Sequence, residues 1–322
     1  MDGNFMWLLR RLSAGQRAKA PLLCAMLTAV CLACAAGEIC MGQAISRQDA
    51  VAWVESQGGS ISSDFQAAGI SQPSPQSVAF VNLEQRKVSD DDLRFVAALR
   101  PVYGLSLAAT QITDQGLTQV AALSELEGLL LDRTQVSDSG LAALRNMPNL
   151  KRISLTYTKI TDAGLEHLRN LHSLESLYLD HTTVEGRGLK HLPAHSVREL
   201  LLSHTQVDDA GLKTLRPLAK LSRLSLTGTK ITDAGLEQLR PLVALTSLQL
   251  DGTAVTGTGL EHLTALPALR ELSLDDTKLT AAAVVPLSRF KSLKLLSVVG
   301  AGLSASAIAQ LKQALPGCEI RT

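Results

Sequence analysis

Aliphatic residues recur along most of this chain in an order that combines two spacings. A pair separated by one residue, L-x-L, comes first, and leucines spaced by three follow, as in ISLTYTKITDAGLEHL at residues 153–168. The L-x-L alternation places two side chains on one face of a strand. The later G-L-x-x-L-x-x-L series predicts the apolar stripe of a two-turn helix. The pattern therefore predicts a short strand followed by a short helix.

This strand and helix unit repeats along the chain. We call the first residue of L-x-L the index position. Neighbouring index positions are 24 residues apart, except from Leu177 to Leu200, where the step is 23, and Ile320 begins a final partial copy. One unit has too few aliphatic side chains to offset the entropy of ordering its backbone, so neighbouring copies must share a core and stack as a solenoid. The ten index positions are Val81, Leu105, Leu129, Ile153, Leu177, Leu200, Leu224, Leu248, Leu272 and Leu296.

Polar residues also recur at fixed places in the unit. A threonine three residues after L-x-L is expected to bond turn backbone that would otherwise be buried without a partner. Thr or Ser followed by Asp, as in Thr161-Asp162, predicts a helix N-cap and a negative first turn. The glycine that follows is expected to allow close packing of helix on sheet. The threonines are Thr110, Thr134, Thr158, Thr182, Thr205, Thr229, Thr253 and Thr277.

The combination of L-x-L, the threonine and T-D-x-G-L resembles the leucine-rich-repeat family. Similar T-D-x-G-L repeats occur in exported bacterial (planctomycete-like) proteins and, with cysteine in place of the threonine, in F-box-type ubiquitin-ligase receptors. The resemblance covers residues 81–322. It implies an α/β fold, a curved right-handed βα horseshoe with a parallel concave sheet and short convex helices.

The amino-terminal segment has the pattern of an export signal. Four basic residues in positions 10–19 precede PLLCAMLTAVCLACAAG at 21–37, which carries no charge. A basic region before an apolar stretch is typical of secretion signals, and about 20 residues are needed for a membrane span. Cleavage, retention as an anchor over residues 20–37 and lipid attachment at Cys34 all remain open. We therefore expect export to the periplasm, the cell envelope or the extracellular space.

The predicted repeats are flanked by caps. At the amino-terminal end we expect a helix from Ser46 to Ser56 that buries Ala50, Trp53 and Val54, then a strand from Ile61 to Phe65 and a loop. At the other end we expect a last helix from Ala305 to Ala314. The predicted organisation is a signal or anchor at 1–40, an amino-terminal cap at 41–80, repeats at 81–304 and a carboxy-terminal cap at 305–322.

Composition and charge exclude several classes of function. Hydrophobic residues make up 46% of the chain and aromatic residues 3%, so the core must be aliphatic. The net charge of +1 gives no field that would favour nucleic acid or an anionic membrane surface. Of five cysteines only Cys318 lies beyond the first forty residues, which leaves no disulfide framework or zinc-ligand spacing.

Candidate chemistry is weak. His181 and His204 occupy the same place in adjacent copies, about 4.8 Å apart by strand spacing, and with Asp180 suggest a metal site, although ligand spacing typical of zinc is absent. A set of Ser203, His204 and Asp180 lacks the G-x-S-x-G motif of a nucleophile elbow. The sequence has no phosphate-binding loop and no glycine pattern typical of dinucleotide binding. We therefore expect no enzyme activity, no cofactor and no metal.

Large side chains gather at the exposed strand positions of a few central copies, whereas the same positions elsewhere are mostly small. Tyr and Arg dominate binding energy at interfaces, and the strand face, about 700 Å² by strand spacing, approaches the roughly 800 Å² per partner of a standard interface. The sequence predicts a monomer that binds a protein or an extended polymer on the concave face, that binds no nucleic acid, and that meets a membrane only through its amino-terminal segment. A substrate-receptor module of a ubiquitin-ligase-like (SCF-type) assembly, a structural envelope protein and a random scatter of surface residues remain alternatives. The predicted ligand-binding residues are Asp132, Arg133, Arg152, Tyr157, Tyr178, Asp180, His181, Leu201 and His204.

Overall fold

A computed structural model describes residues 44–64, 74 and 77–322 of the chain. The expected signal or anchor at 1–40 lies outside the described residues, as does Phe65 at the end of the predicted first strand. Residues 46–322 form one compact unit. In the described ranges, no helix has both the length and the apolar character that crossing a membrane requires.

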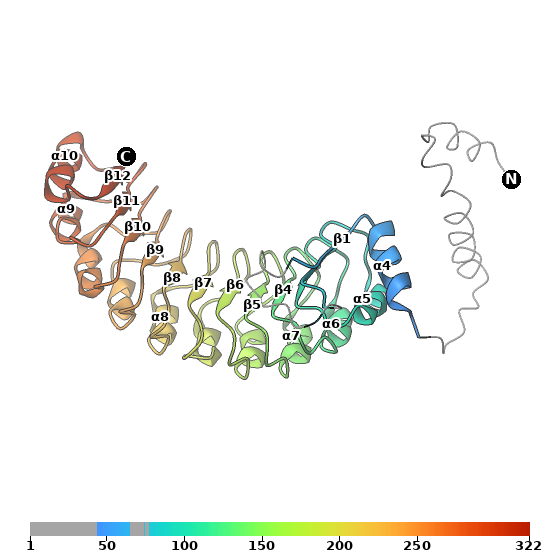
Figure 1. Ribbon diagram of the computed structural model, residues 1–322. Coiled ribbons are helices and arrows are strands. Elements are labelled where there is room, and N and C mark those ends of the chain that lie inside the picture. Colours follow the sequence, from blue (N-terminus) through green and yellow to red (C-terminus); the bar gives the residue numbers. More distant parts are fainter. Residues whose placement is uncertain (1–43, 65–73, 75–76) are drawn as a thin grey trace, which may run out of the picture. The chain divides into compact units, whose positions relative to one another are not determined.

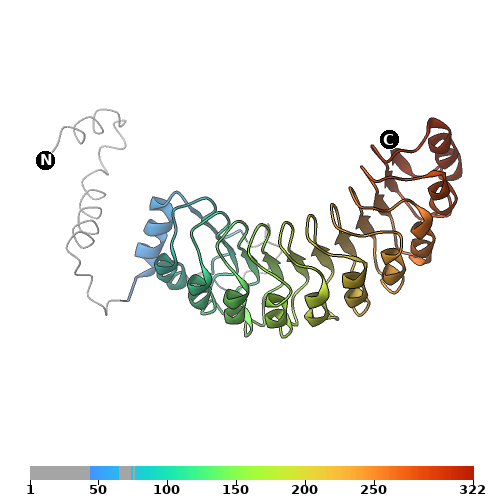
Figure 2. The ribbon, with the colours of Figure 1, turned by 180° about the vertical axis from the view of Figure 1, so that it is seen from behind.

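One sheet runs through the unit along its concave side, and short helices line its convex side (Figures 1 and 2). The twelve strands of the described residues follow each other in chain order. β1 pairs antiparallel with β2, and every later neighbour pair is parallel. The strands are β1 (Ser60–Ser62), β2 (Phe80–Asn82), β3 (Gly104–Ser106), β4 (Gly128–Leu130), β5 (Arg152–Ser154), β6 (Ser176–Tyr178), β7 (Glu199–Leu201), β8 (Arg223–Ser225), β9 (Ser247–Gln249), β10 (Glu271–Ser273), β11 (Leu295–Ser297) and β12 (Glu319–Arg321).

The index positions pair with each other across the whole sheet. Val81 lies opposite Leu105, and the series continues in register to Leu296 opposite Ile320. The ten index side chains are at most 2% exposed. The second leucines of L-x-L are equally buried, with Leu155, Leu179 and Leu226 at 0%. The predicted stacked solenoid with an aliphatic core is therefore confirmed.

From the sequence, the missing residue of the 23-residue step, together with Pro193, is expected to disturb the stack locally. The sheet is not disturbed there, so this expectation was wrong for the strands. Leu177 and Leu200 pair in register like every other index pair. The shorter connection is accommodated on the convex side, where a 3-10 helix ends at His191 and Leu192 continues in extended backbone. The Pro193 carbonyl then accepts from the N–H groups of Ser196 and Val197, at 3.3 and 3.5 Å.

The convex segments include fewer α-helices than the pattern predicts. Several are 3-10 helices of five residues, and the three-residue spacing of the leucines in G-L-x-x-L-x-x-L is compatible with the three residues per turn of a 3-10 helix. The helices are α4 (Arg47–Ser56), η1 (Asp90–Asp92), α5 (Leu93–Ala98), α6 (Asp114–Val120), α7 (Asp138–Leu144), η2 (Gly164–Leu168), η3 (Arg187–His191), α8 (Asp209–Leu212), η4 (Lys213–Leu215), η5 (Gly235–Leu239), η6 (Thr258–Ala265), η7 (Ala281–Ala283), α9 (Val284–Leu287) and α10 (Ala305–Ala314).

The repeated threonines fill the predicted role. Each hydroxyl is buried and donates to the backbone carbonyl three residues earlier, at 2.5–2.7 Å, as Thr158 does to Leu155. The turn after each strand therefore satisfies this carbonyl internally.

The aspartate after the Thr or Ser joins one repeat to the next. Asp138 accepts from the backbone N–H of Thr161 at 2.8 Å and from its hydroxyl at 2.6 Å. The predicted cap is present at Thr161, whose hydroxyl accepts from the Ala163 N–H, but Ser137 makes no such side-chain bond. The carboxylate thus binds a neighbouring repeat, a role that the sequence prediction did not include. The same pairs occur at Asp90 with Thr113, Asp114 with Ser137, Asp209 with Thr232 and Asp233 with Thr256.

The repeated glycine packs against the preceding repeat, not against the sheet as expected. A Cβ at Gly188 would lie 2.8 Å from the Cα of Asp162. Cβ atoms at Gly140 and Gly164 would similarly meet the aspartates Asp114 and Asp138. Glycine at this place therefore lets consecutive repeats approach each other.

At the amino-terminal end the predicted helix is present as α4, and the strand predicted from Ile61 to Phe65 is observed as β1, from Ser60 to Ser62. Ser46 caps α4, and Ala50 and Val54 are fully buried. Trp53 is only half-buried and stacks on Phe95 at 4.8 Å between ring centroids, so its predicted burial was wrong. At the other end α10 has the predicted bounds.

Candidate functional site

One residue of each repeat, directly before the buried threonine or, in the first and last of these repeats, before Arg86 and Ala301, has left-handed backbone. The φ angles at these places lie between 53° and 65°, a region that is uncommon for residues other than glycine. Since every repeat shares this conformation, successive side chains leave the backbone in the same direction. We call this set the left-handed column. It consists of Gln85, Ala109, Arg133, Tyr157, His181, His204, Gly228, Gly252, Asp276 and Gly300.

Four members of the column form a continuous stack. The guanidinium carbon of Arg133 lies 4.1 Å from the Tyr157 ring centroid. The Tyr157 and His181 rings are 4.0 Å apart and 8° from parallel, and the His181 and His204 rings are 4.5 Å apart at 20°. Tyr157 keeps 43% of its surface exposed. We call Arg133, Tyr157, His181 and His204 the planar stack. The predicted column of His181 and His204 is confirmed, and it extends to two residues that the sequence prediction had not aligned with them.

The stack favours neutral imidazole at its centre. Desolvation by the neighbouring groups, His204 and the positive charge of Arg133 lower the pKa of His181 below its ordinary 6.5, while Asp180 opposes them. His181 therefore binds a proton only at more acidic pH than an isolated histidine.

A second cluster lies on the strand face. The Tyr178 hydroxyl donates to Glu199 Oε2 at 2.8 Å, and Arg223 Nε lies 3.4 Å from Glu199 Oε1. Desolvation and then the bond to Glu199 raise the pKa of the Tyr178 phenol above 10.0. The sequence prediction omits Glu199 and Arg223. Both stand directly before an index position, as Arg152 does, so their place in the repeat was the signal that pointed to them.

The other predicted residues are distributed around these clusters. The Asp132 carboxylate accepts from the Ser154 hydroxyl and from the Thr156 N–H, and Asp180 accepts from the Ser203 N–H at 2.6 Å. Both carboxylates thus bind the next repeat as well as bordering the concave side. Arg152 is exposed at the start of β5, and Leu201 is half-buried next to Tyr178 in register.

The arrangement brings together no hydrolytic set at the candidate residues. The Ser203 hydroxyl bonds to the Ser225 hydroxyl at 2.9 Å, and the bond from Ser203 to Asp180 uses its backbone N–H. Among the described residues, no group of three or more His, Cys, Asp or Glu side chains is arranged to hold a metal. What the two clusters offer is exposed aromatic and guanidinium surface at Tyr157, Arg133 and Arg223.

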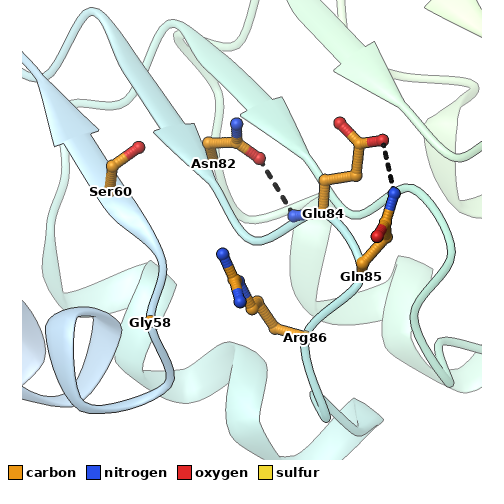
Figure 3. A pocket seen from close by; sticks show the side chains of 6 residues that line it. All are labelled: Gly58, Ser60, Asn82, Glu84, Gln85 and Arg86. Atoms are coloured by element: carbon orange, nitrogen blue, oxygen red, sulfur yellow. Dashed lines mark hydrogen bonds between the residues drawn. The ribbon is translucent and has the colours of Figure 1, made fainter.

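Two hollows adjoin the first strands. One, of about 340 Å³, lies where Arg86 points toward Gly58 beneath Ser60 and Asn82 (Figure 3). The Asn82 side chain accepts from the Glu84 N–H there at 2.9 Å. The other, of about 620 Å³, extends along the starts of β3 to β6 and includes Arg152 among its lining residues. The predicted site and this second hollow therefore share Arg152.

Comparisons with known proteins concern the repeats and the fold. A family model described as leucine rich repeat matches residues 124–184, and a second with the same description matches residues 218–239. No curated protein matches the chain. An internalin (inlF) from Listeria monocytogenes has a similar structure, with 19% identity and a TM-score of 0.51 over 76% of this chain and 86% of that one. A second internalin of that species has 23% identity and a TM-score of 0.45 over 73% of this chain and 90% of its own.

Proposed function

Because the chain is a leucine-rich-repeat protein, we propose that it is a non-enzymatic scaffold that binds a protein or an extended surface polymer on its concave side, outside the cytoplasm. The leucine-rich-repeat fold suggests a protein-binding scaffold, because stacked repeats provide an extended concave surface for a partner. Enclosed pockets that suit small metabolites are a different kind of site.

One observation carries the choice of surface. The planar stack and the pair of Tyr178 and Glu199 lie in consecutive repeats. On either side of the stack the left-handed column carries a small residue, Ala109 before it and Gly228 after it. Exposed aromatic and arginine side chains contribute most to interface energy. The partner is therefore proposed to contact the repeats between Asp132 and His204.

A recovery experiment tests this surface. Full-length wild type and the double variant Tyr157→Ala/Tyr178→Ala are used to recover partners from envelope extract. A matched control, Val243→Ala/Val285→Ala, removes two exposed hydrophobic side chains outside both clusters. We expect the control to recover the same partner as wild type and the tyrosine variant to lose most of it, with unchanged circular dichroism for both. Equal recovery by all three proteins would contradict the proposed surface.

The proposed location has a separate test. The basic and apolar residues of 1–37 support export. Mass spectrometry of the mature amino terminus, together with cell fractionation, distinguishes a cleaved signal from a retained anchor or a lipidated Cys34. An unprocessed chain recovered only from the cytoplasm would contradict export and favour a role in an intracellular assembly.

A further inference from the structure

The planar stack ends at two glycines. Gly228, the next member of the left-handed column, lies against His204, since a Cβ at residue 228 would be 2.7 Å from the imidazole Cε1. At Gly252 a Cβ would meet only backbone atoms of Gly228, at 3.9 Å. The face of His204 opposite His181 therefore borders two repeats in which the column carries no side chain. A further planar group has room to continue the stack there.

The surroundings of these glycines are acidic. The Gly228 N–H donates to the Asp251 backbone carbonyl at 2.7 Å and the Gly252 N–H to the Asp275 backbone carbonyl at 2.8 Å, so two aspartates flank the glycine pair. Both carboxylates accept from neutral hydroxyl groups, Asp251 from Ser273 and Asp275 from Ser297, and so keep their negative charge. The next column residue, Asp276, is exposed. In the turns that carry these column residues, at 225–230, 249–254 and 273–278, the cations are Lys230 and Lys278, both exposed. Three carboxylates against two ammonium groups leave an excess of negative charge that favours a cationic group.

The other end of the stack shows which cation fits such a ring. There the Arg133 guanidinium lies over Tyr157 at 4.1 Å. A guanidinium is planar, stacks on aromatic faces and also pairs with carboxylates, whereas an ammonium group acts as a compact point charge. His181 lies behind His204 with a lowered pKa, which disfavours a second positive charge behind the ring that the cation would meet.

We infer that the open face of His204, above Gly228 and Gly252, binds an arginine side chain of a protein partner. The guanidinium takes the place of a fifth planar group, and the aspartates that flank the glycines supply its counter-charge. This inference rests on the proposed function and specifies the partner as a protein with an exposed arginine.

The test uses short peptides as probes. Acetyl-Gly-Arg-Gly-amide and its Lys and Phe counterparts are titrated into the full-length protein while the imidazole NMR signals of His204 and of its stacked neighbour His181, which every variant keeps, are followed. In His204→Asn the ring is lost, and in Gly252→Asn the vacant position is filled. Asn accepts left-handed backbone, and the column already carries non-glycine residues such as Asp276, so both variants are expected to fold. Gln85→Asn, in the same column far along the chain from the glycines, is the matched control.

We expect the Arg peptide to shift the His204 signals and to bind more tightly than the Lys or Phe peptide. His204→Asn and Gly252→Asn should weaken that binding about two- to five-fold, and Gln85→Asn should not change it. The inference would be overturned if the Arg and Lys peptides bound equally or if the Phe peptide bound more tightly. It would also be overturned if neither site variant changed the binding. If the peptides overturn the inference but Tyr157→Ala/Tyr178→Ala still fails to recover the partner, only the arginine site is rejected and the proposed function stands. Failure to recover any partner with wild type would count against the proposed function while the peptide result is judged separately.

Discussion

The guanidinium carbon of Arg133 lies 4.1 Å from the centroid of the Tyr157 ring, one repeat further along the chain. Both residues have φ near +56° to +59°, so the same turn in two repeats aims both side chains in one direction. A left-handed turn repeated along the chain thus creates a contact between residues 24 positions apart. The planar stack is a consequence of repeat geometry.

A double-mutant cycle on Arg133 and Tyr157 measures this contact. We expect Arg133→Ala and Tyr157→Ala to interact by about 0.5–1 kcal/mol, the range of exposed cation–π pairs. Urea denaturation of wild type, both single variants and the double variant gives the coupling. A coupling of zero within error would show that the pair is adjacent without attraction.

Alanine substitution should destabilise the protein more at Gly188, which packs against the preceding repeat, than at Gly128. A Cβ at Gly188 would press on the Asp162 backbone, whereas one at Gly128 would have no neighbour within 4 Å. Gly188→Ala should therefore lower the free energy of unfolding by about 1–3 kcal/mol, and Gly128→Ala should change it by less than about 0.5 kcal/mol. Thermal or urea unfolding of both variants checks this. Similar losses for the two would refute the proposed role of the glycine in repeat packing.

Asp233 makes stability depend on acid pH. Although burial opposes ionisation, bonds from Thr256, Gly257 and Gly259 hold the pKa of this carboxyl below its ordinary 3.8. Below the ordinary value the unfolded chain binds more protons than the folded one. The stabilisation is therefore present above about pH 3.8 and is lost as pH falls through the folded pKa.

Asp233→Asn is expected to lower the free energy of unfolding by about 1–3 kcal/mol at pH 7. The difference in this free energy between the variant and wild type should shrink below about pH 4. Urea denaturation over a pH series measures it. Asp91→Asn, at an exposed aspartate, is the control and should track wild type. A difference that stays constant with pH would mean that the charge of Asp233 is irrelevant.

His181 gives a second pH dependence, in the mildly acidic range. Its pKa is lowered by desolvation, by His204 and by Arg133, so the folded protein binds this proton less readily than the unfolded chain. The associated stability is present above pH 6.5 and falls as pH drops through the folded pKa. NMR titration of the His181 ring should show a midpoint below 6.5 that rises in His204→Asn. A midpoint unchanged by that substitution would contradict coupling between the two rings.

The strand register was predictable because the index leucines recur every 24 residues and the buried face of each strand allows one alignment only. The convex helices were less predictable, because their three-residue leucine spacing is compatible with both helix types: α7 is an α-helix, whereas η2, η3 and η5 are 3-10 helices. Likewise, the pairing of Asp138 with Thr161 joins residues 23 positions apart, which local cap rules do not consider.

The sequence by itself determined the stacked repeats, their aliphatic core and the gathering of large side chains between Asp132 and His204, since composition and period are properties of the chain. Only the tertiary structure decided that Arg133, Tyr157, His181 and His204 stack, that Tyr178 bonds Glu199, and that the His204 face opens onto two glycines. The reason is physical: a side chain's direction depends on the left-handed φ at its turn and on how closely the next repeat approaches. Both are set when the repeats pack together.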